Sequence, residues 1–195
     1  QNGSDYKNLS VAATVLPRKT DSAGNITDAG AYLHLGETAT ANVGKLIVGN
    51  NAFVQVDGVL NTNTAGNTFA KGSLTVINGT WNYNGSFGSL SSADLTINGK
   101  VKGVTGDRYI NVRDNSVLTI NGKNKGDIKF DTGIRMFNGA TLVINSDSLD
   151  GGTRIWLPNE NSATRKTNNI ILNANTSIHS FCFGTNTETI ITFAD

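Results

Sequence analysis

Short runs of apolar residues alternate with polar ones along most of the chain, and one of these runs recurs. It reads Leu-Thr-Val-Ile-Asn-Gly at 74–79 and Leu-Thr-Ile-Asn-Gly at both 95–99 and 118–122, and it decays to Leu-Val-Ile-Asn at 142–145 and Ile-Ile-Leu-Asn at 170–173. Leu, Ile, Val and Thr favour strands, and Asn-Gly favours the turn that ends a strand. The closing asparagines lie 20 to 28 residues apart. Such a period is typical of a solenoid, whose repeats bury their apolar faces against one another.

The repeats predict an all-β chain. Between two copies of the phrase there is room for two further strands and turns, so we expect a single-stranded right-handed parallel β-helix of about six to seven rungs over 45–195. Residues 1–44 lack the phrase and are expected to form an N-terminal β cap and the first strands, because a solenoid needs an atypical first unit. Apolar residues never recur with the 3.6-residue period of a helix.

Alternation within each strand indicates which side chains point inward. Leu118 and Ile120 share one face, and we expect them in apolar columns; Trp81 is also expected in the core. The closing asparagines are expected to stack as a hydrogen-bonded ladder at one corner. The copy at 74–79 has one residue more than the others between its leucine and asparagine, which predicts a bulge at Val76 or Ile77.

Composition narrows the functional classes. The net charge is +1 and charged residues make up 16% of the chain, so no global field favours nucleic acid as a partner. No apolar stretch of about 18 residues is present, so no transmembrane segment is expected. The chain begins Gln-Asn-Gly-Ser, which would fit a secreted protein after removal of its signal. Cys182 is the only cysteine and is expected to be a buried small hydrophobe rather than the thiol of a site with His179.

A candidate glycan site follows from strand parity. Arg135, Arg154 and Trp156 alternate with apolar residues and are therefore expected to point outward, beside a polar insertion at 158–169 that contains Glu160. An exposed aromatic ring next to guanidinium and carboxylate groups suits a sugar. The alternative is that Trp156 packs under the insertion.

A second candidate is a basic patch. Two lysine pairs directly follow Asn-Gly in consecutive copies of the repeat, which would align them as a two-by-two patch suited to an anionic polysaccharide or phosphate. The four residues are Lys100, Lys102, Lys123 and Lys125. The alternative is an ordinary solvated face balanced by Asp107 and Asp127.

A third candidate is an assembly edge near the end of the sequence. The run containing Ile190, Ile191 and Phe193 matches the first strand of a rung, as at 109–113, and no further rung follows. An unfinished strand offers unpaired N–H and C=O groups for pairing with another chain. We therefore expect end-to-end self-association, unless the natural solenoid is longer.

The Leu-Thr-Ile-Asn-Gly repeats and the final Ile-Ile-Thr-Phe-Ala-Asp resemble the β-solenoids of bacterial adhesins and autotransporter passengers, and pectin-lyase-like repeats in general, over about 45–195. The resemblance implies a non-catalytic bacterial protein, secreted or on the cell surface, with an adhesin-like or structural role and a polysaccharide or host glycan as partner. A self-assembling extracellular fibre subunit and a carbohydrate-active enzyme, either a polysaccharide lyase or a glycoside hydrolase, are the alternatives.

The enzyme alternative lacks motifs. Neither Asp-Asp nor Gly-His occurs, and the nearest carboxylate pair, Asp147 and Asp150, lies in one loop, whereas an acid and a base must face the same bond. No zinc, EF-hand or phosphate-loop spacing is present either. We therefore expect no catalytic residue, no metal and no cofactor.

Overall fold

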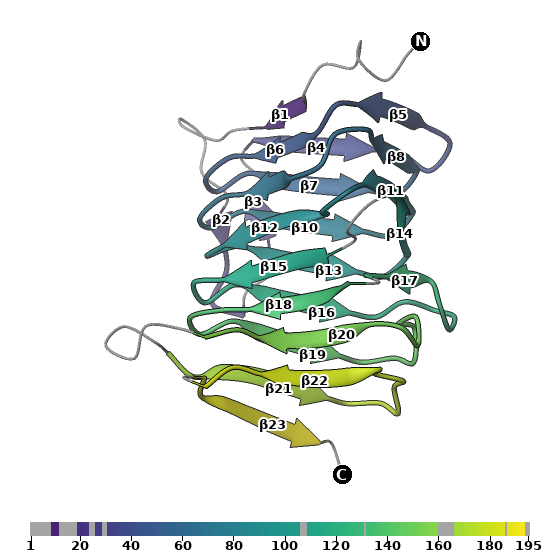
Figure 1. The fold of residues 1–195 in the computed structure, drawn as a ribbon. Helices are drawn as coiled ribbons and strands as arrows, with labels where there is room; N and C mark the ends of the chain where they lie inside the picture. The colour runs from purple at the N-terminus through teal and green to yellow at the C-terminus, as the bar shows by residue number, and fades with distance from the viewer. Residues whose placement is uncertain are drawn as a thin grey trace.

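The protein is described by a computed structural model, which covers residues 9–11, 19–23, 26–28, 31–105, 109–130, 132–159, 166–185 and 187–193. Within these ranges there are strands and no helix, so none of the described segments is a helix that could cross a membrane. Three parallel sheets wind into a β-solenoid of about seven turns (Figure 1). The expected all-β parallel solenoid is thus confirmed.

We name the sheets by their place in Figure 1. The front sheet contains, in spatial order, β1 (Leu9–Val11), β6 (Leu46–Val48), β9 (Asn67–Phe69), β12 (Gly88–Ser91), β15 (Tyr109–Arg113), β18 (Gly133–Met136), β20 (Arg154–Leu157) and β22 (Ser180–Phe183). The back sheet contains β4 (Tyr32–Leu35), β7 (Phe53–Val56), β10 (Leu74–Ile77), β13 (Asp94–Ile97), β16 (Val117–Ile120), β19 (Thr141–Ile144), β21 (Asn168–Leu172) and β23 (Thr189–Phe193). The side sheet contains β5 (Thr40–Val43), β8 (Val59–Thr62), β11 (Thr80–Asn84), β14 (Lys100–Thr105) and β17 (Ile128–Lys129).

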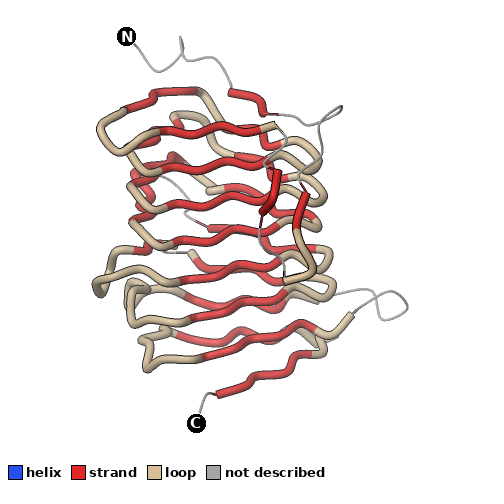
Figure 2. The backbone as a smooth tube through the Cα atoms, turned by 180° about the vertical axis from the view of Figure 1, so that it is seen from behind, coloured by secondary structure: helices blue, strands red, loops and turns tan. Residues whose placement is uncertain are grey.

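The solenoid begins earlier than the repeat phrase does. Strands β4 and β5 lie within the stretch expected as cap and first strands, and they already pair in parallel with β7 and β8. A hairpin of β2 (Lys19–Thr20) and β3 (Ile26–Asp28) is the antiparallel pair of the described chain. Seen from behind, it stands upright in front of the back sheet (Figure 2).

Inward side chains form continuous columns. Leu95, Leu118 and Leu142 are direct partners on neighbouring strands, and all three are fully buried. Parallel strands lie about 4.8 Å apart, so aligned leucines touch along the whole column. Truncating Leu118 to Ala would therefore cost about 2–5 kcal/mol. Trp81 is fully buried as expected, and its indole Nε1 donates to the Thr62 hydroxyl at 3.0 Å.

The predicted bulge at Val76 or Ile77 is wrong. Strand β10 pairs with both neighbours without a shift in register. The whole phrase slides by one residue instead, so that Thr75 lies inside opposite Leu95 while Leu74 lies outside. The slide keeps Ile77 and Asn78 aligned with the corresponding residues of the next rung. Its cost is a threonine in the apolar column.

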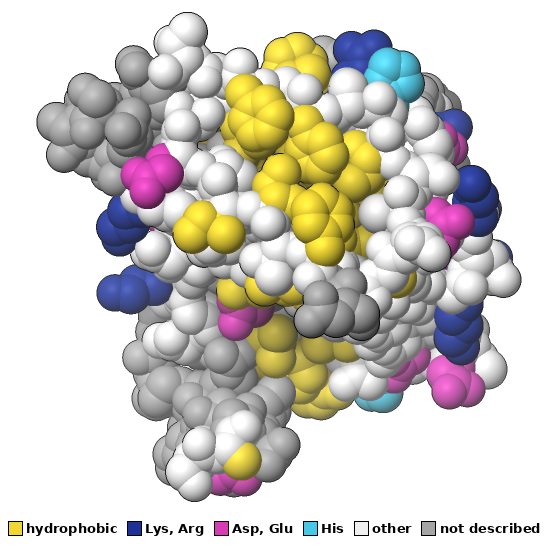
Figure 3. All heavy atoms as spheres, turned by 90° about the horizontal axis from the view of Figure 1, so that it is seen from below, with side chains coloured by type: hydrophobic (Ala, Val, Ile, Leu, Met, Phe, Trp, Pro, Cys, Tyr) yellow, Lys and Arg dark blue, Asp and Glu magenta, His cyan; other side chains and the backbone are white. Residues whose placement is uncertain are grey.

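The C-terminal end of the solenoid is open. Hydrophobic side chains gather at its centre when it is viewed from below (Figure 3). On the last two strands, Phe183, Ile190 and Phe193 are 60%, 56% and 70% exposed. Strand β23 covers one side of the last turn, and a hollow of about 560 Å³ lies between it and β22, bordered by Leu172 and Phe181. Part of the core is therefore uncovered at this end.

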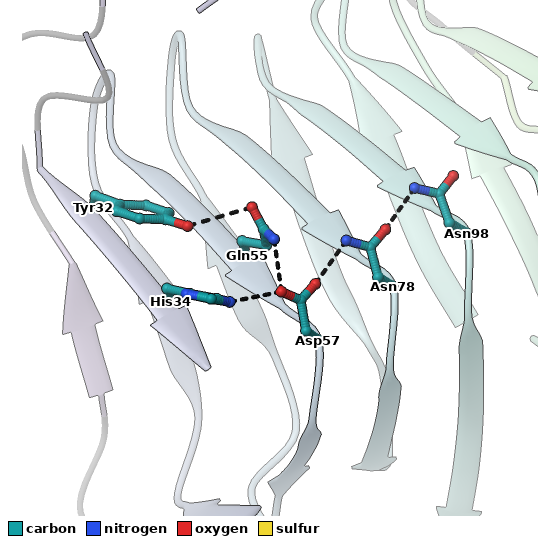
Figure 4. A network of polar contacts seen from close by, with 6 residues as sticks. All are labelled: Tyr32, His34, Gln55, Asp57, Asn78 and Asn98. Atoms are coloured by element: carbon teal, nitrogen blue, oxygen red, sulfur yellow. Dashed lines mark hydrogen bonds and ion pairs between the residues drawn. The ribbon is translucent and has the colours of Figure 1, made fainter. Parts of the chain in front are cut away.

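The asparagine ladder is confirmed. Each side-chain amide donates from its Nδ2 to the Oδ1 of the preceding rung at 2.7–2.8 Å, through Asn173, Asn145, Asn121, Asn98 and Asn78. Asn78 donates to the Oδ1 of Asp57, so a carboxylate accepts the last bond (Figure 4). Since every amide points the same way, the bonds polarise one another.

Candidate functional site

One surface combines arginines and aromatic rings, the outer face of the front sheet between β15 and β20. Outward positions in these strands are set by the inward columns of Ile110, Ile134 and Ile155. We call this surface the arginine–aromatic face. It is formed by Tyr109, Asn111, Arg113, Gly133, Arg135, Phe137, Arg154, Trp156 and Pro158.

Aromatic rings hold two of the arginines. The Arg135 guanidinium carbon lies 3.8 Å from the centre of the Tyr109 ring, and that of Arg113 lies 4.8 Å from the centre of the Phe137 ring. A guanidinium over a ring face is attracted by the ring's electron distribution. Stacking occupies the flat face of the guanidinium and leaves its N–H edge available for a ligand.

Trp156 lies on the same face, and a glycine makes room for it. Gly133 has φ +119°, and a Cβ there would come within 2.5 Å of the Arg154 carbonyl oxygen and 2.8 Å of the Trp156 ring. The indole therefore rests against bare backbone on the neighbouring strand and remains 37% exposed. Arg135 is the direct strand partner of Trp156.

A shallow hollow of about 210 Å³ is bordered by Arg135, Phe137, Trp156 and Pro158. It is smaller than the pockets of about 300–1,000 Å³ that enclose drug-sized ligands, so it suits one ring of a longer molecule. The expected Arg135, Arg154 and Trp156 thus come together on one surface. Glu160, with the rest of 160–165, lies outside the described residues, whereas Asn168 and Asn169 at the end of the expected insertion belong to strand β21.

No carboxylate among the described residues belongs to this face. Arg135 and Arg154 make no hydrogen bond or ion pair with any residue that the structure describes. Asp114 follows Arg113, but its oxygens accept from Asn138 and Ser91. These two hydrogen bonds, with the charge of Arg113, hold the pKa of Asp114 below its ordinary value. The described residues that form the face therefore include three arginines and no acidic residue.

The four lysines of the predicted basic patch do not align as expected. Lys102 pairs with Lys129 on the next rung of the side sheet. Residues 123–126 form a turn instead of a strand, and Asp127 fixes that turn by accepting from the backbone and side-chain nitrogens of Asn124. The alignment failed because the segment after Asn121-Gly122 is longer than its counterpart after Asn98-Gly99.

Carboxylates also accompany two of these lysines. The Lys100 Nζ lies 3.5 Å from an Asp127 oxygen, and the Lys125 Nζ lies 3.8 Å from an Asp147 oxygen. Burial raises the pKa of Asp127, but its bonds from Asn124 and the Lys100 charge outweigh this and keep the pKa below the ordinary value. The lysines thus form local ion pairs rather than one patch.

The predicted assembly edge divides into exposed and packed residues. Ile191 pairs with Ile170 and packs against the core. Phe193 is exposed and borders the hollow at the C-terminal end, whereas Ile190 is exposed on the outward side of β23, as the strand partner of Asn169. Strand β23 pairs with β21 in the back sheet, so it corresponds to the repeat phrase; the expected match with the front-sheet strand at 109–113 is wrong. Its other edge faces the end of the solenoid.

Cys182 is not buried as expected. It is half-exposed on the front sheet as the strand partner of Trp156, and its Sγ lies 3.7 Å from the Ser180 hydroxyl, which lies 3.3 Å from the Nδ1 of His179. Side chains alternate along β22, and Phe181 takes the inward position opposite Ile155, so Cys182 next to it faces outward. Across the described residues, no three His, Cys, Asp or Glu side chains gather as a metal site would require.

A polar cluster that the sequence did not reveal caps the asparagine ladder (Figure 4). The Nε2 of His34 lies 2.6 Å from an Asp57 oxygen, and Gln55 donates to that oxygen at 2.7 Å while accepting from the Tyr32 hydroxyl at 3.3 Å. The bond from Asn78, together with those from His34 and Gln55, lowers the pKa of Asp57 against the opposing effect of burial. These groups satisfy one another, which is a structural role.

Sequence reasoning also missed Tyr109 and Arg113 as parts of the face. Both could have been identified from the sequence, since they occupy outward-facing positions of β15, the strand next to β18 in the front sheet. Comparison of the chain with models of known protein families, with characterised proteins and with solved structures finds no match.

Proposed function

We propose that this chain is a non-catalytic, adhesin-like β-solenoid, secreted or on a bacterial cell surface, that binds a glycan through its arginine–aromatic face. The observation that carries the proposal is Trp156, an indole held over Gly133 and exposed beside the hollow that Arg135 borders. The resemblance of the repeats to adhesin and pectin-lyase-like right-handed β-helices supports the same role.

The physical argument rests on how proteins hold sugars. The apolar C–H face of a sugar ring stacks on an aromatic ring, and its hydroxyls accept from N–H donors around that ring. The ring lies on a strand bonded on both sides, by β18 and β22. Because this strand is already ordered, binding a ligand costs little conformational entropy, so more of the contact energy appears as affinity.

The test is a glycan-array screen followed by titration of the positive glycans. Trp156→Ala should abolish or strongly weaken binding, while the unfolding midpoint stays close to that of the parent protein. Tyr32→Ala is a matched control, because it also removes an exposed aromatic ring, but from the back sheet. Binding that survives Trp156→Ala, or a large fall in melting temperature in that variant, would contradict the proposal.

A second candidate function is self-assembly through the open C-terminal end, as in an extracellular fibre subunit. It is supported by the hollow bordered by Phe181 and Phe193 and by the exposure of Phe183 and Ile190 on the last two strands, since large exposed apolar patches mark contact surfaces. Light scattering over a range of concentrations should show association that Ile190→Lys abolishes. A monomer at every concentration, unaffected by that substitution, would exclude assembly through this end.

A further inference from the structure

We propose that the arginine–aromatic face selects an acidic sugar unit, whose ring stacks on Trp156 while its carboxylate or sulfate is bound directly by Arg135 and Arg154. This inference rests on the proposed glycan-binding function and goes beyond it by assigning the charge of the ligand and the groups that read it.

The first step is the charge of the face. Three arginines lie on the outward positions of three consecutive strands, and no described residue of the face is acidic. Since the whole chain has a net charge of only +1, this positive charge is a local feature. Guanidinium groups beside a low-dielectric ring attract anions more strongly than they would in open water.

The second step is position. Arg135 is the strand partner of Trp156, so the two backbones lie about 4.8 Å apart. Arg154 precedes Trp156 by two residues on the same face of β20, which places it about 7 Å away along the strand. A sugar ring on the indole would therefore have one guanidinium across the sheet and another along the strand. An acidic group on either side of the ring lies within reach of one of them.

The third step is the kind of contact. Tyr109 holds the Arg135 guanidinium by its flat side, so the N–H donors at its edge remain for a ligand. The planar fork of a guanidinium matches the two oxygens of a carboxylate or sulfate, and such charge-assisted pairs are about twice as strong as neutral hydrogen bonds. None of the described residues of the face is a carboxylate that could hold a bridging cation. Binding should therefore be direct and should persist in a chelator.

Pairs of sugars that differ in charge alone provide the test. Methyl glucuronoside is compared with methyl glucoside, and N-acetylglucosamine 6-sulfate with N-acetylglucosamine, so that carboxylate and sulfate recognition are separated. Quenching of tryptophan emission reports binding at Trp156, because Trp81 is fully buried and supplies a constant background. The titrations are run with EDTA present and repeated at higher salt.

At least one acidic sugar should bind about tenfold or more tightly than its neutral counterpart, and the difference should shrink as salt rises. Replacing both arginines, as Arg135→Gln with Arg154→Gln, should remove the preference and leave the weaker neutral binding. Lys102→Gln is the control, since it removes a positive charge from the side sheet and should leave the preference unchanged.

The outcomes separate the two proposals. Equal affinity for charged and neutral sugars, or a preference that survives the double substitution, would overturn acidic selectivity while leaving glycan binding in place. Loss of binding in EDTA would overturn direct recognition by arginine. If neither these sugars nor any glycan of the array binds, the proposed function falls, and the inference falls with it.

Discussion

Thr75→Val tests the account of how the repeats fit together. Thr75 lies in an inward column between Val54 and Leu95 and is fully buried. Its hydroxyl has no hydrogen-bond partner among the described residues. The register slide in β10 therefore leaves a polar atom in an apolar column, and valine would replace it with a methyl group of nearly the same shape.

The expected gain follows from the two terms that change. An unsatisfied buried hydroxyl costs about 1–3 kcal/mol, and part of this returns when the hydroxyl is removed together with its desolvation penalty. Valine and threonine are both β-branched, so strand propensity hardly changes. We expect the free energy of unfolding to rise by about 1–2 kcal/mol, which for a chain of this size corresponds to about 2–8 °C in melting temperature.

Calorimetry and urea unfolding measure this change, with Thr96→Val as the matched control. Thr96 lies on the next strand but faces outward, so the same substitution there should alter stability by less than about 0.5 kcal/mol. A Thr75→Val variant that is no more stable than the parent, with Thr96→Val neutral, would refute the reasoning. It would mean that the hydroxyl is satisfied, for example by an enclosed water molecule.

Three further predictions follow. Asn98→Ala breaks two amide bonds of the ladder and should lower the free energy of unfolding by about 1–3 kcal/mol in urea titrations, whereas Asn98→Asp should keep the bond it accepts. Because the pKa of Asp57 is lower in the folded than in the unfolded state, its carboxylate stabilises the fold above the unfolded-state pKa of about 3.9. This stabilisation is lost as pH falls through the folded-state pKa, so Asp57→Asn should weaken the fall in unfolding free energy at acid pH, measured by urea titrations over a pH series. Gly133→Ala should cost about 1–3 kcal/mol or more and also shift the emission of Trp156, since the residue has positive φ and its Cβ would meet both the Arg154 carbonyl oxygen and that ring.

The fold was predictable because its signal repeats. The copies at 95–99, 118–122 and 142–145 place leucine and isoleucine inward and asparagine at the corner, so several copies support one conclusion. The wrong prediction of a bulge at Val76 or Ile77 arose from aligning the first residues of the phrase, Leu74 with Leu95. The structure aligns the last residues of the phrase, Ile77 and Asn78, with their counterparts in the next rung. The asparagine ladder and the apolar column through Ile77 stabilise this register by more than the buried threonine destabilises it.

The site was predictable only in part, because the relevant residues are brought together across rungs. The alternation of inward and outward side chains along a strand can be read from neighbouring residues alone, and it correctly indicated that Arg135, Arg154 and Trp156 face outward. The stacking of Arg135 on Tyr109 and the space that Gly133 leaves depend on the register between strands. That register is fixed by turn lengths, and the same uncertainty in turn length misaligned the lysines.

Inward and outward positions respond differently to sequence change, which explains why this chain indicates its architecture more clearly than its ligand. An inward leucine touches its partners in the rungs on both sides, so a change at Leu118 disturbs the whole column. Outward side chains such as Arg154 touch little, and they can vary while the fold persists. Gly133 links the two, because its backbone conformation belongs to the fold and its missing side chain makes room for Trp156. Positions of this kind, where a backbone requirement and a surface ring coincide, are where a solenoid couples its fold to recognition.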